Sequence, residues 1–545
     1  MLPAWIRPFN WQNGKIKMNK KIVVFLMIFI FSLAFSACGS NDGAENSKVP
    51  EADTDFTEVL KDYVKSEATT EFSAENLKKV STVPTFEISK YTNSAREILQ
   101  PYNIFTDGMC LQRDSVIKIF GTAPVATKKI AISFRGTTYY GTAGNGSWEV
   151  YLPMMTAGGP YEMTVISNIG RITLSDVYVG EVYLLSGQSN MEFTSYWNSS
   201  KISDLYENAE ACKNDRIRLL NVQQKREVGQ PSEPIKLERE VEWQRAEKST
   251  IRAFSAVGYI FGREMEKILD CPVGLICNAM GGSIIEYWMS KETYNEYRKN
   301  NSSYIDRSND VLTNCLGFNG GISPLEGYVF RGVVWYQGES NVNGNQGYYG
   351  NALKALIKNW REFFCNDNLT FTACELARFQ QDPYGYSIIN EKINEVAKED
   401  PLVAVAVNVD GGDWNDIHPA DKHDIGKRAA SETLRKFFGK AVNAAPVLES
   451  VERVDGRTVK LILNENVELR NGNNGFEVKT SLGWEYIVSV SAERNILTVT
   501  SQKEFTAIRY GYRVKLTDEI KADVSKFVTV FDEEGYPMDL FIAEA

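Results

Sequence analysis

The two histidines of this chain limit the acid–base chemistry that it can perform near neutral pH. The 545-residue sequence contains only His418 and His423, and both lie in the stretch DWNDIHPADKH. An imidazole is the usual general base for activating a serine hydroxyl. If the protein uses a serine–histidine mechanism, its base must therefore come from this stretch, and the nucleophile has to be found elsewhere.

Ser189 is the best candidate for that nucleophile. It lies in EVYLLSGQSNMEF, where an apolar run typical of a strand ends in a polar turn, residues 186–190. Gly187 allows the sharp bend that would leave the Ser189 hydroxyl at the end of the strand. Met191 stands where the GxSxG elbow has its last glycine, which argues against an ordinary α/β-hydrolase elbow. Ser340, in WYQGESNV, also follows an apolar run and is the alternative nucleophile.

His418 is the better of the two candidate bases. It follows the apolar run LVAVAVNV and a glycine-rich bend, which predicts a position at the carboxyl end of a strand. Asp416, two residues earlier, would point the same way in an extended segment, and its carboxylate could orient the ring. Asp413 is the alternative acid. His423 lies near the start of a predicted helix, KHDIGKRAASETLRKFF, where the helix N-terminus disfavours an imidazolium ion.

Three regions with different patterns must position these residues. Residues 95–176 contain short alternating runs broken by turns, such as KIAISFRG, which predict a small antiparallel β domain. Residues 177–440 alternate apolar strand-like runs with amphipathic helical patterns, so we expect a mostly parallel sheet covered on both faces. In such sheets, sites form outside the carboxyl ends of the strands. Residues 441–545 return to β patterns and predict a C-terminal β module.

The start of the chain predicts export. Residues 22–37, IVVFLMIFIFSLAFSA, follow several lysines and precede Cys38, so residues 1–38 have the pattern of an export signal whose true start could be Met18. The ending Ser-Ala-Cys resembles a bacterial lipobox, in which the cysteine carries the lipid. A short membrane anchor is the alternative, although about 20 apolar residues are normally needed to span a bilayer. Residues 39–94 are polar and predict a tether.

The composition of the chain limits the kinds of partner and ligand that we expect for it. The net charge is −10 and no Lys/Arg-rich run stands out, so we expect no nucleic-acid partner. A zinc site has few possible ligands because the chain has two histidines and no CxxC pair. We therefore expect no metal, and contact with a membrane only through the N-terminal lipid. The protein would be an exported lipoprotein, periplasmic or anchored at the outer membrane or cell surface.

Four segments that occur in order carry a family resemblance: SGQSNME, GLICNAMGGSIIEYWMS, GVVWYQGESN and DIHPADKHDIG. Together they resemble the four blocks of the SGNH hydrolase superfamily, in its sialate O-acetylesterase branch. NIFTDGMCLQRD resembles the N-terminal module of that branch, and GYPMDLFI is a looser match to its C-terminal segment. The resemblance covers roughly residues 95–545. It implies a flavodoxin-like, three-layer α/β/α domain with a mostly parallel sheet, flanked by the N-terminal β domain and the C-terminal β module.

The resemblance also implies a set of oxyanion donors. The backbone N–H of Ser189 would be one donor. The second block would supply the N–H of Gly282 or of the adjacent Gly281. Most SGNH enzymes take a third donor from an asparagine side chain, but this branch has QGE at that place, so Gln337 is the expected donor.

The remaining site residues follow from the same blocks. Ser189 matches the nucleophile, His418 the base and Asp416 its orienting acid. The wider superfamily often has the acid three residues before the histidine, where this chain has Asn415, so Asp413 stays open as the alternative. Four further polar residues of the blocks are expected to shape the pocket or bind substrate: Gln188, Asn190, Glu339 and Asn341.

The implied reaction is hydrolysis of an acetyl ester through an acyl-enzyme, without metal or organic cofactor. The expected substrate is O-acetylated carbohydrate, with acetylated sialic acid first and acetylated xylan or another plant glycan second. Four aromatic residues near the motifs could stack on sugar rings or belong to the core: Trp288, Trp335, Tyr336 and Trp414. The non-enzymatic alternative is a carbohydrate-binding surface lipoprotein whose middle domain is a decayed hydrolase.

Overall fold

The computed structural model describes residues 99–168, 170–197, 200–207, 212–222, 241–301, 315–380 and 382–545, all within one compact unit of the chain. The predicted export signal, Cys38 and the polar tether lie outside these residues. Within the described ranges, no helix has both the length and the apolar character needed to cross a bilayer.

An antiparallel β sheet forms the N-terminal part, where the alternating runs predicted it. Its strands are hydrogen-bonded in the order β1 (Gln100–Pro101), β3 (Ile117–Thr122), β6 (Ser147–Leu152), β5 (Thr137–Gly144), β4 (Ile130–Phe134), β7 (Gly158–Ser167) and β8 (Gly170–Gly187). A short strand, β2 (Cys110–Gln112), pairs in parallel with β8. The apolar residues of this sheet share one core with the α/β domain.

Strand β8 joins this sheet to the α/β domain. Its first half pairs antiparallel with β7, and its second half pairs in parallel with β11 (Val273–Ala279) and β12 (Gly332–Tyr336). Exposed residues alternate in the first half, whereas every residue from Val177 to Gly187 is buried. A strand needs this change when it leaves a sheet with a solvated face and enters one covered on both faces. The strand therefore runs through the domain boundary that we predict between residues 176 and 177.

Five of the parallel strands have the order β11-β8-β12-β13-β14, with β13 at Thr370–Cys374 and β14 at Val403–Ala406. Numbered along the chain among these five alone, the order is 2-1-3-4-5, which is that of flavodoxin-like sheets. Two strands that the sequence patterns do not predict extend the sheet beyond β11: β9 (Asn214–Asn221), which also pairs in parallel with β11, and β10 (Gln244–Ala246), which pairs antiparallel with β9. Charged residues interrupt the apolar run of β9, which hides the strand pattern.

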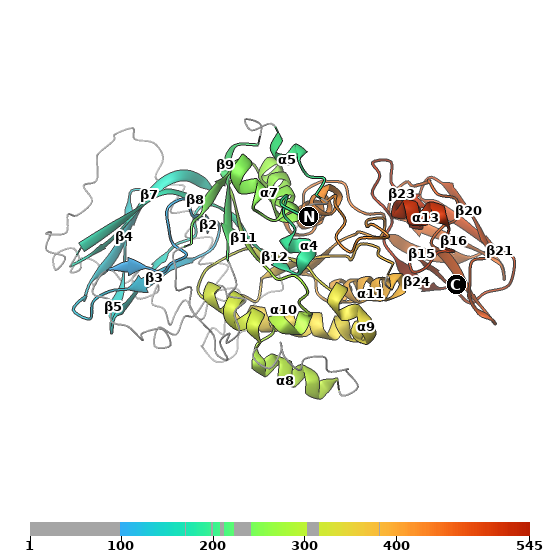
Figure 1. The fold of residues 1–545 in the computed structure, drawn as a ribbon, viewed down its shortest axis with the longest axis horizontal. Coiled ribbons are helices and arrows are strands. Elements are labelled where there is room, and N and C mark those ends of the chain that lie inside the picture. Colours follow the sequence, from blue (N-terminus) through green and yellow to red (C-terminus); the bar gives the residue numbers. More distant parts are fainter. Residues whose placement is uncertain are drawn as a thin grey trace, which may run out of the picture. The chain divides into compact units, whose positions relative to one another are not determined.

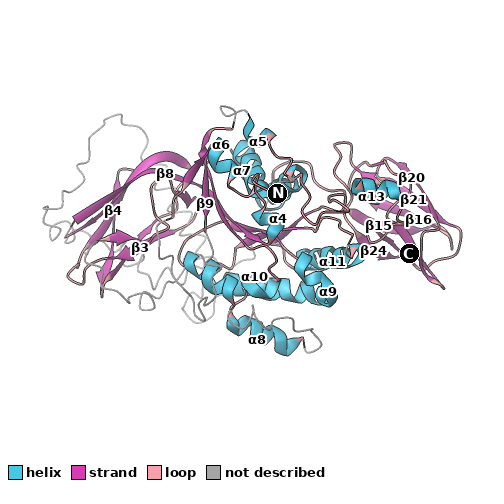
Figure 2. Cartoon of the chain, viewed as in Figure 1, coloured by secondary structure: helices cyan, strands magenta, loops and turns pink. Residues whose placement is uncertain are grey.

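Helices cover both faces of this sheet (Figure 1, Figure 2). One layer contains α7 (Ala256–Leu269) and α12 (His423–Phe438), and the other contains α10 (Tyr349–Phe363) and α11 (Pro383–Glu399). A Cβ atom at Gly258 would lie 2.1 Å from a methyl carbon of Leu185, so any larger residue there would force that side chain to move. Shorter helices complete the domain: α4 (Ser189–Glu192), α5 (Asp204–Glu207), α6 (Lys248–Arg252), α8 (Lys291–Asn300) and α9 (Val342–Asn345).

The C-terminal part is a β module with its own hydrophobic core. One sheet has the order β15 (Leu448–Arg453), β16 (Thr458–Leu463), β21 (Ile496–Ser501) and β20 (Val488–Glu493). A second has the order β19 (Gly483–Glu485), β18 (Phe476–Thr480), β22 (Ala507–Tyr510) and β24 (Phe541–Glu544). Strands β17 (Glu468–Leu469) and β23 (Val530–Phe531) pair with each other, and α13 spans Asp518–Ala522.

Candidate active site

Ser189 opens the short helix α4 directly after β8. Gly187 has a φ of 139°, and a Cβ atom there would lie 2.1 Å from the carbonyl oxygen of Tyr336, so the bend excludes other residues. The backbone N–H groups of Met191 and Glu192 both donate to the carbonyl oxygen of residue 188, which closes the turn. The first N–H groups of a helix have no acceptor within it, so that of Ser189 lies at the open end.

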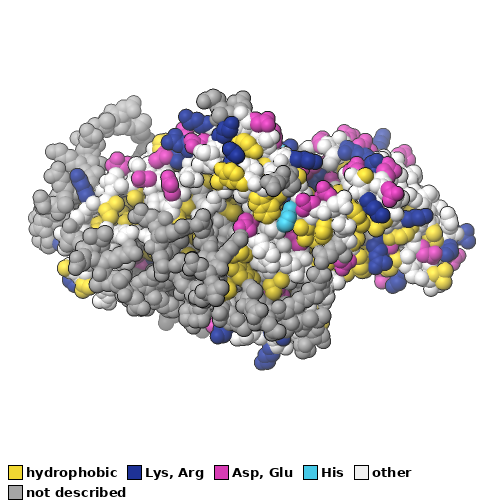
Figure 3. Space-filling model, viewed as in Figure 1, with side chains coloured by type: hydrophobic (Ala, Val, Ile, Leu, Met, Phe, Trp, Pro, Cys, Tyr) yellow, Lys and Arg dark blue, Asp and Glu magenta, His cyan; other side chains and the backbone are white. Residues whose placement is uncertain are grey.

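His418 contacts Ser189 directly. Its Nε2 lies 2.8 Å from the Ser189 Oγ, and the imidazole packs edge-on against the Trp197 ring at 5.0 Å between centroids. The side chain stays 29% exposed. Figure 3 colours histidine side chains without telling His418 from His423, and shows histidine at the surface beside acidic and apolar side chains. Burial, together with the charge of Lys422, holds the pKa of His418 below its ordinary value, against the opposing pull of Asp416. The ring is therefore neutral at pH 7 and can accept a proton.

Asp416 is the carboxylate next to the ring. Its Oδ1 accepts the backbone N–H of His418 at 2.9 Å and lies 3.7 Å from the ring Nδ1. The second distance is longer than a hydrogen bond, so the carboxylate acts on the ring through charge in this arrangement. Asp413 instead accepts the backbone N–H of Asn415 at 2.9 Å, in a local turn. The geometry therefore favours Asp416 as the orienting acid.

The second motif forms a turn that packs against the nucleophile. Ser283 N–H donates to the carbonyl of Met280 at 3.2 Å, and Gly282 has a φ of +76°, the value that a type II turn needs at its third residue. The N–H of Gly281 donates to the Glu192 carboxylate at 2.8 Å. A Cβ atom at Gly281 would lie 3.5 Å from the Cβ of the nucleophilic serine. The two candidate donors thus differ, because the amide of Gly281 already serves a carboxylate.

Gln337 is buried and cross-links the motifs. Its Nε2 has three acceptors in reach: Gln188 Oε1 at 3.1 Å, Ser283 O at 3.0 Å and Asn341 Oδ1 at 2.8 Å. Its Oε1 accepts the hydroxyl of Tyr349 at 3.1 Å. An amide nitrogen carries two protons, so protein acceptors already occupy it fully. This arrangement argues against the expected oxyanion role. The sequence predicts that Gln337 lies at a strand end, but it does not predict which way its side chain turns.

The four residues expected to bind substrate are also buried. Gln188, Asn190, Glu339 and Asn341 are between 1% and 5% exposed. Asn190 donates to Glu339 Oε1 at 2.5 Å, and Asn341 accepts from the Gln337 amide. They hold the strand ends together in this structure, and their burial argues against direct contact with a substrate.

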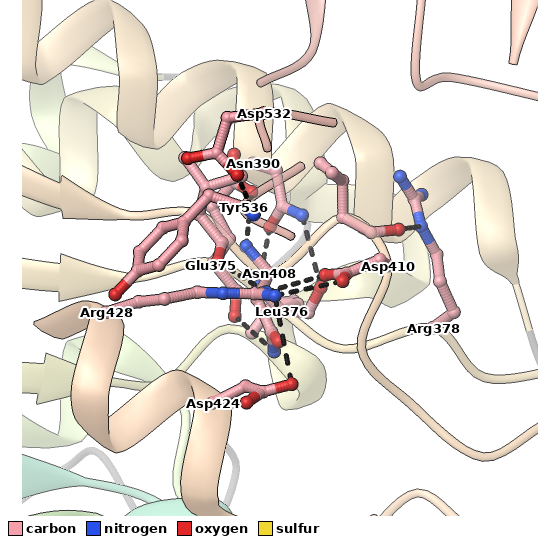
Figure 4. Close-up of polar contacts among 12 residues, drawn as sticks. Glu375, Leu376, Arg378, Asn390, Asn408, Asp410, Asp424, Arg428, Asp532 and Tyr536 are labelled. Carbon is pink, nitrogen blue, oxygen red and sulfur yellow. Dashed lines mark hydrogen bonds and ion pairs between the residues drawn. The ribbon is translucent and has the colours of Figure 1, made fainter. Parts of the chain in front are cut away.

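The loop that carries His418 follows β14 and is anchored by buried charged and amide side chains (Figure 4). Arg428, on α12, donates to both carboxylate oxygens of Asp410, at 2.6 and 2.9 Å. Asn408 donates its backbone N–H at 3.0 Å to the buried carboxylate of Glu375, at the end of β13. A two-point guanidinium–carboxylate bond fixes orientation as well as distance, so the beginning of this loop has a defined position.

His423 is committed to two carboxylates. Its Nδ1 lies 2.6 Å from Asp421 Oδ1, and its Nε2 lies 2.9 Å from Asp204 Oδ2. The hydrogen bond that His423 donates to Asp421 and the negative charges of Asp421 and Asp204 raise the pKa of His423, although its position at the start of α12 predicts the opposite. The two carboxylates outweigh the helix N-terminus. With both nitrogens paired, His423 is not available as a base. Ser340, the alternative nucleophile, donates its backbone N–H to Gln188 Oε1 at 3.3 Å, whereas His418 contacts Ser189.

Lys422 and Trp197 complete the surroundings of the pair, and the sequence analysis does not single out either residue. Lys422 is buried, and its Nζ donates to Asn190 Oδ1 at 2.8 Å. The only sequence signal for Lys422 is a charged residue four positions after His418.

Among the predicted aromatic residues, three are core side chains and one, Trp414, is partly exposed; the core residues are Trp288, Trp335 and Tyr336. In the part of the chain that the structure describes, no group of three or more His, Cys, Asp or Glu side chains could hold a metal ion.

A serine and an imidazole in contact at the carboxyl edge of a mostly parallel sheet define a hydrolase-type site on a three-layer α/β fold. Residues 179–434 match the family described as carbohydrate esterase, sialic acid-specific acetylesterase. The matched range begins within β8, ends within α12 and contains every site residue discussed above.

Individual relatives agree with this family. The chain is 32% identical over 243 residues to the sialate O-acetylesterase of Homo sapiens, covering 41% of this chain and 44% of that protein. It is 26% identical over 350 residues to the sialate O-acetylesterase of Mus musculus, covering 52% and 62%. The chain thus spans about half the length of the curated relatives it matches. The crystal structure of a carbohydrate acetylesterase from Xanthomonas citri superposes with a TM-score of 0.70 at 25% identity, covering 82% of this chain and 99% of that one.

Proposed function

We propose that this protein is a serine esterase that removes O-acetyl groups from carbohydrate, with O-acetylated sialic acid as its first substrate. The observation that carries the proposal is the 2.8 Å contact between His418 Nε2 and Ser189 Oγ. This contact also argues against a decayed, purely carbohydrate-binding domain, since a binding protein has no need to hold a serine hydroxyl against a neutral imidazole.

The proposed reaction has two half-reactions that share one base. His418 takes the proton of the Ser189 hydroxyl, and the serine oxygen attacks the ester carbonyl. The N–H groups of Ser189 and Gly282 bind the tetrahedral oxyanion, and the negative charge of Asp416 stabilises the imidazolium. His418 then gives its proton to the leaving sugar oxygen. A water molecule deprotonated by the same ring hydrolyses the acetyl-serine and releases acetate.

The comparisons support the substrate class at two levels of detail. The family and the mammalian relatives are described by sialic acid, which puts acetylated sialic acid first. The Xanthomonas citri protein, similar over nearly its whole length, is described only as a carbohydrate acetylesterase. That relative keeps acetylated xylan or another plant glycan as the second candidate.

The setting that we propose is outside the cytoplasm. The apolar segment and the Ser-Ala-Cys ending support an exported lipoprotein that carries its lipid on Cys38. A single lipid-bearing residue would hold the soluble domains at a membrane surface, where extracellular glycans are accessible.

Acetate release tests the function. The substrates are 9-O-acetylated sialic acid and acetylated xylo-oligosaccharide, the protein is the chain without its lipid, and the control is Ser189→Ala. Release that depends on Ser189 from the sialic acid supports both the mechanism and the first substrate. Release from the xylan fragment alone keeps the mechanism and replaces the substrate. If neither ester is cleaved, labelling of Ser189 by an organophosphonate decides between another acetylated glycan and a protein without this chemistry.

A further inference from the structure

A buried chain of three side chains runs beside the Ser189–His418 pair. Lys422 Nζ donates to Asn190 Oδ1 at 2.8 Å, and Asn190 Nδ2 donates to Glu339 Oε1 at 2.5 Å. All three side chains are almost entirely withdrawn from solvent. They come from three different motifs, which follow β8, β12 and β14.

Asn190 is the central residue of this chain because it connects the segment that carries Ser189 with the segment that carries His418. It directly follows Ser189 in α4, and its Nδ2 also donates to the carbonyl oxygen of Ile417 at 3.1 Å. Ile417 directly precedes His418. One amide side chain therefore ties the backbone of the nucleophile turn to the backbone of the histidine loop.

The orientation of this amide requires a partner that only donates. Both protons of Asn190 Nδ2 are used by Glu339 and the Ile417 carbonyl, so its Oδ1 is left as a buried acceptor. The protonated ammonium of Lys422 supplies a donor there and has no acceptor of its own. A reversed amide would turn NH₂ protons toward an ammonium group and an oxygen toward a carboxylate. Lys422 thus selects the amide orientation that bonds the histidine loop.

Burying this lysine is costly, which makes a role in packing alone a poor explanation. Burial lowers the pKa of Lys422 to about 7, against the attraction of Glu339, Asp416 and Asp421. The Phe193 ring lies 4.5 Å from its Nζ and offers partial compensation. Strongly perturbed ionisable groups of this kind concentrate at functional sites.

We propose that Lys422 is a positioning residue of the site: by fixing the amide of Asn190, it holds the Ser189 turn and the His418 loop at their contact distance. This inference rests on the proposed esterase function and assigns Lys422 no contact with the substrate. Neither the sequence motifs nor the comparisons give Lys422 a role.

The positive charge of Lys422 supplies a readout that a merely structural role would not move. The charged residues acting on the His418 ring are Asp416, which raises its pKa, and Lys422, which lowers it. Replacing Lys422 by methionine removes the lowering charge, so the pKa of His418 should rise. Because the base must be neutral, the acidic limb of the activity profile should then move to higher pH.

The test uses the rate at which an organophosphonate labels Ser189, measured against pH in the full chain, so that no substrate has to be known. We expect Lys422→Met to slow labelling about tenfold or more, the effect of leaving a buried acceptor without its donor. We expect its acidic limb to lie at higher pH than that of the wild-type chain. Lys118→Met is the matched control, since Lys118 is equally buried and pairs with Glu149 in the N-terminal sheet. That variant should lose thermal stability but keep the wild-type rate and pH profile.

A second variant keeps the test decisive if Lys422→Met does not fold. Asn190→Ala removes the bridging amide and keeps the charges of Lys422 and Glu339 in the site, and it should slow labelling similarly. In a folded double variant, Lys422→Met should add little to Asn190→Ala, because both act through one contact. A labelling rate within threefold of wild type for folded Lys422→Met, or a slower rate with an unmoved acidic limb, would overturn the proposal. Absence of labelling in the wild-type chain would instead contradict the esterase function itself.

Discussion

The imidazole of His418 lies 2.8 Å from the hydroxyl of Ser189, although the two residues are 229 positions apart in the chain. The contact forms because β8 and β14 are parallel strands of one sheet, so that the segments after both strands meet at its carboxyl edge. The predictions below start from this pair and from the side chains that hold it.

The first prediction separates the two histidines. Ser189→Ala or His418→Ala should lower kcat by roughly 10⁴-fold or more while leaving the fold intact, as expected when one member of a nucleophile–base pair is removed. His423→Ala should leave turnover at neutral pH nearly unchanged, because both nitrogens of His423 are paired with carboxylates. Initial rates of acetate release with circular dichroism as the folding control check both statements. An inactive His423→Ala beside an active His418→Ala would reverse the assignment.

The pH profile should report the environment of His418. Burial and Lys422 hold the pKa of this ring below its ordinary value of 6.5, and the base works only when neutral. The acidic limb of kcat/KM should therefore have its midpoint below pH 6.5. A midpoint above that value, measured with a substrate that does not ionise in this range, would mean that Asp416 dominates the ring instead.

Gln337→Ala distinguishes a cross-link from an oxyanion donor. Because Gln337 Nε2 serves three protein acceptors, its loss should cost about 1–3 kcal/mol of unfolding free energy through unsatisfied buried groups. The fall in kcat should then stay below the factor of about 10²–10³ typical of a lost oxyanion donor. Urea denaturation and steady-state kinetics on one preparation give both quantities. Unchanged stability with a loss in that higher range would restore the oxyanion role.

Stability should depend on pH through His423. Its folded-state pKa is raised by Asp421 and Asp204, so its contribution is fully present below the unfolded value near 6.5 and is lost as pH rises through the folded value. His423→Gln should therefore lower Tm more at pH 5.5 than at pH 9. The difference between wild type and variant at each pH cancels the titration of other groups. A Tm difference that is the same at both values would show that the His423 contacts carry no charge.

The proposed lipid anchor is testable at Cys38. In a bacterial host the wild-type chain should fractionate with membranes and carry a lipid on its N-terminal cysteine, detectable by mass spectrometry. Cys38→Ser should lose the lipid-modified mature form. If this variant is instead processed and held exactly like wild type, the apolar segment before it anchors the protein without lipid.

Much of the architecture follows from the sequence because it depends on local pattern. Runs such as GLICNA and GVVWY are apolar at every position, which indicates strands buried on both faces, and the helical patterns between them place α7, α10, α11 and α12. The scarcity of histidine then restricts the base to one stretch. Ser189 and His418 are accessible to sequence reasoning because each follows an apolar run that ends in a glycine bend.

Side-chain direction is not accessible in the same way. The sequence predicts that Asn190, Gln337 and Glu339 lie at strand ends, yet only the tertiary structure decides that they turn inward and bond one another. The same holds for His423, where Asp204 arrives from another element and reverses the effect of the helix N-terminus. The pattern of apolar strands and amphipathic helices predicts which motif residues lie near the edge of the sheet. Which of them faces substrate depends on hydrogen bonds between segments far apart in sequence, because each buried donor must find an acceptor in the finished fold.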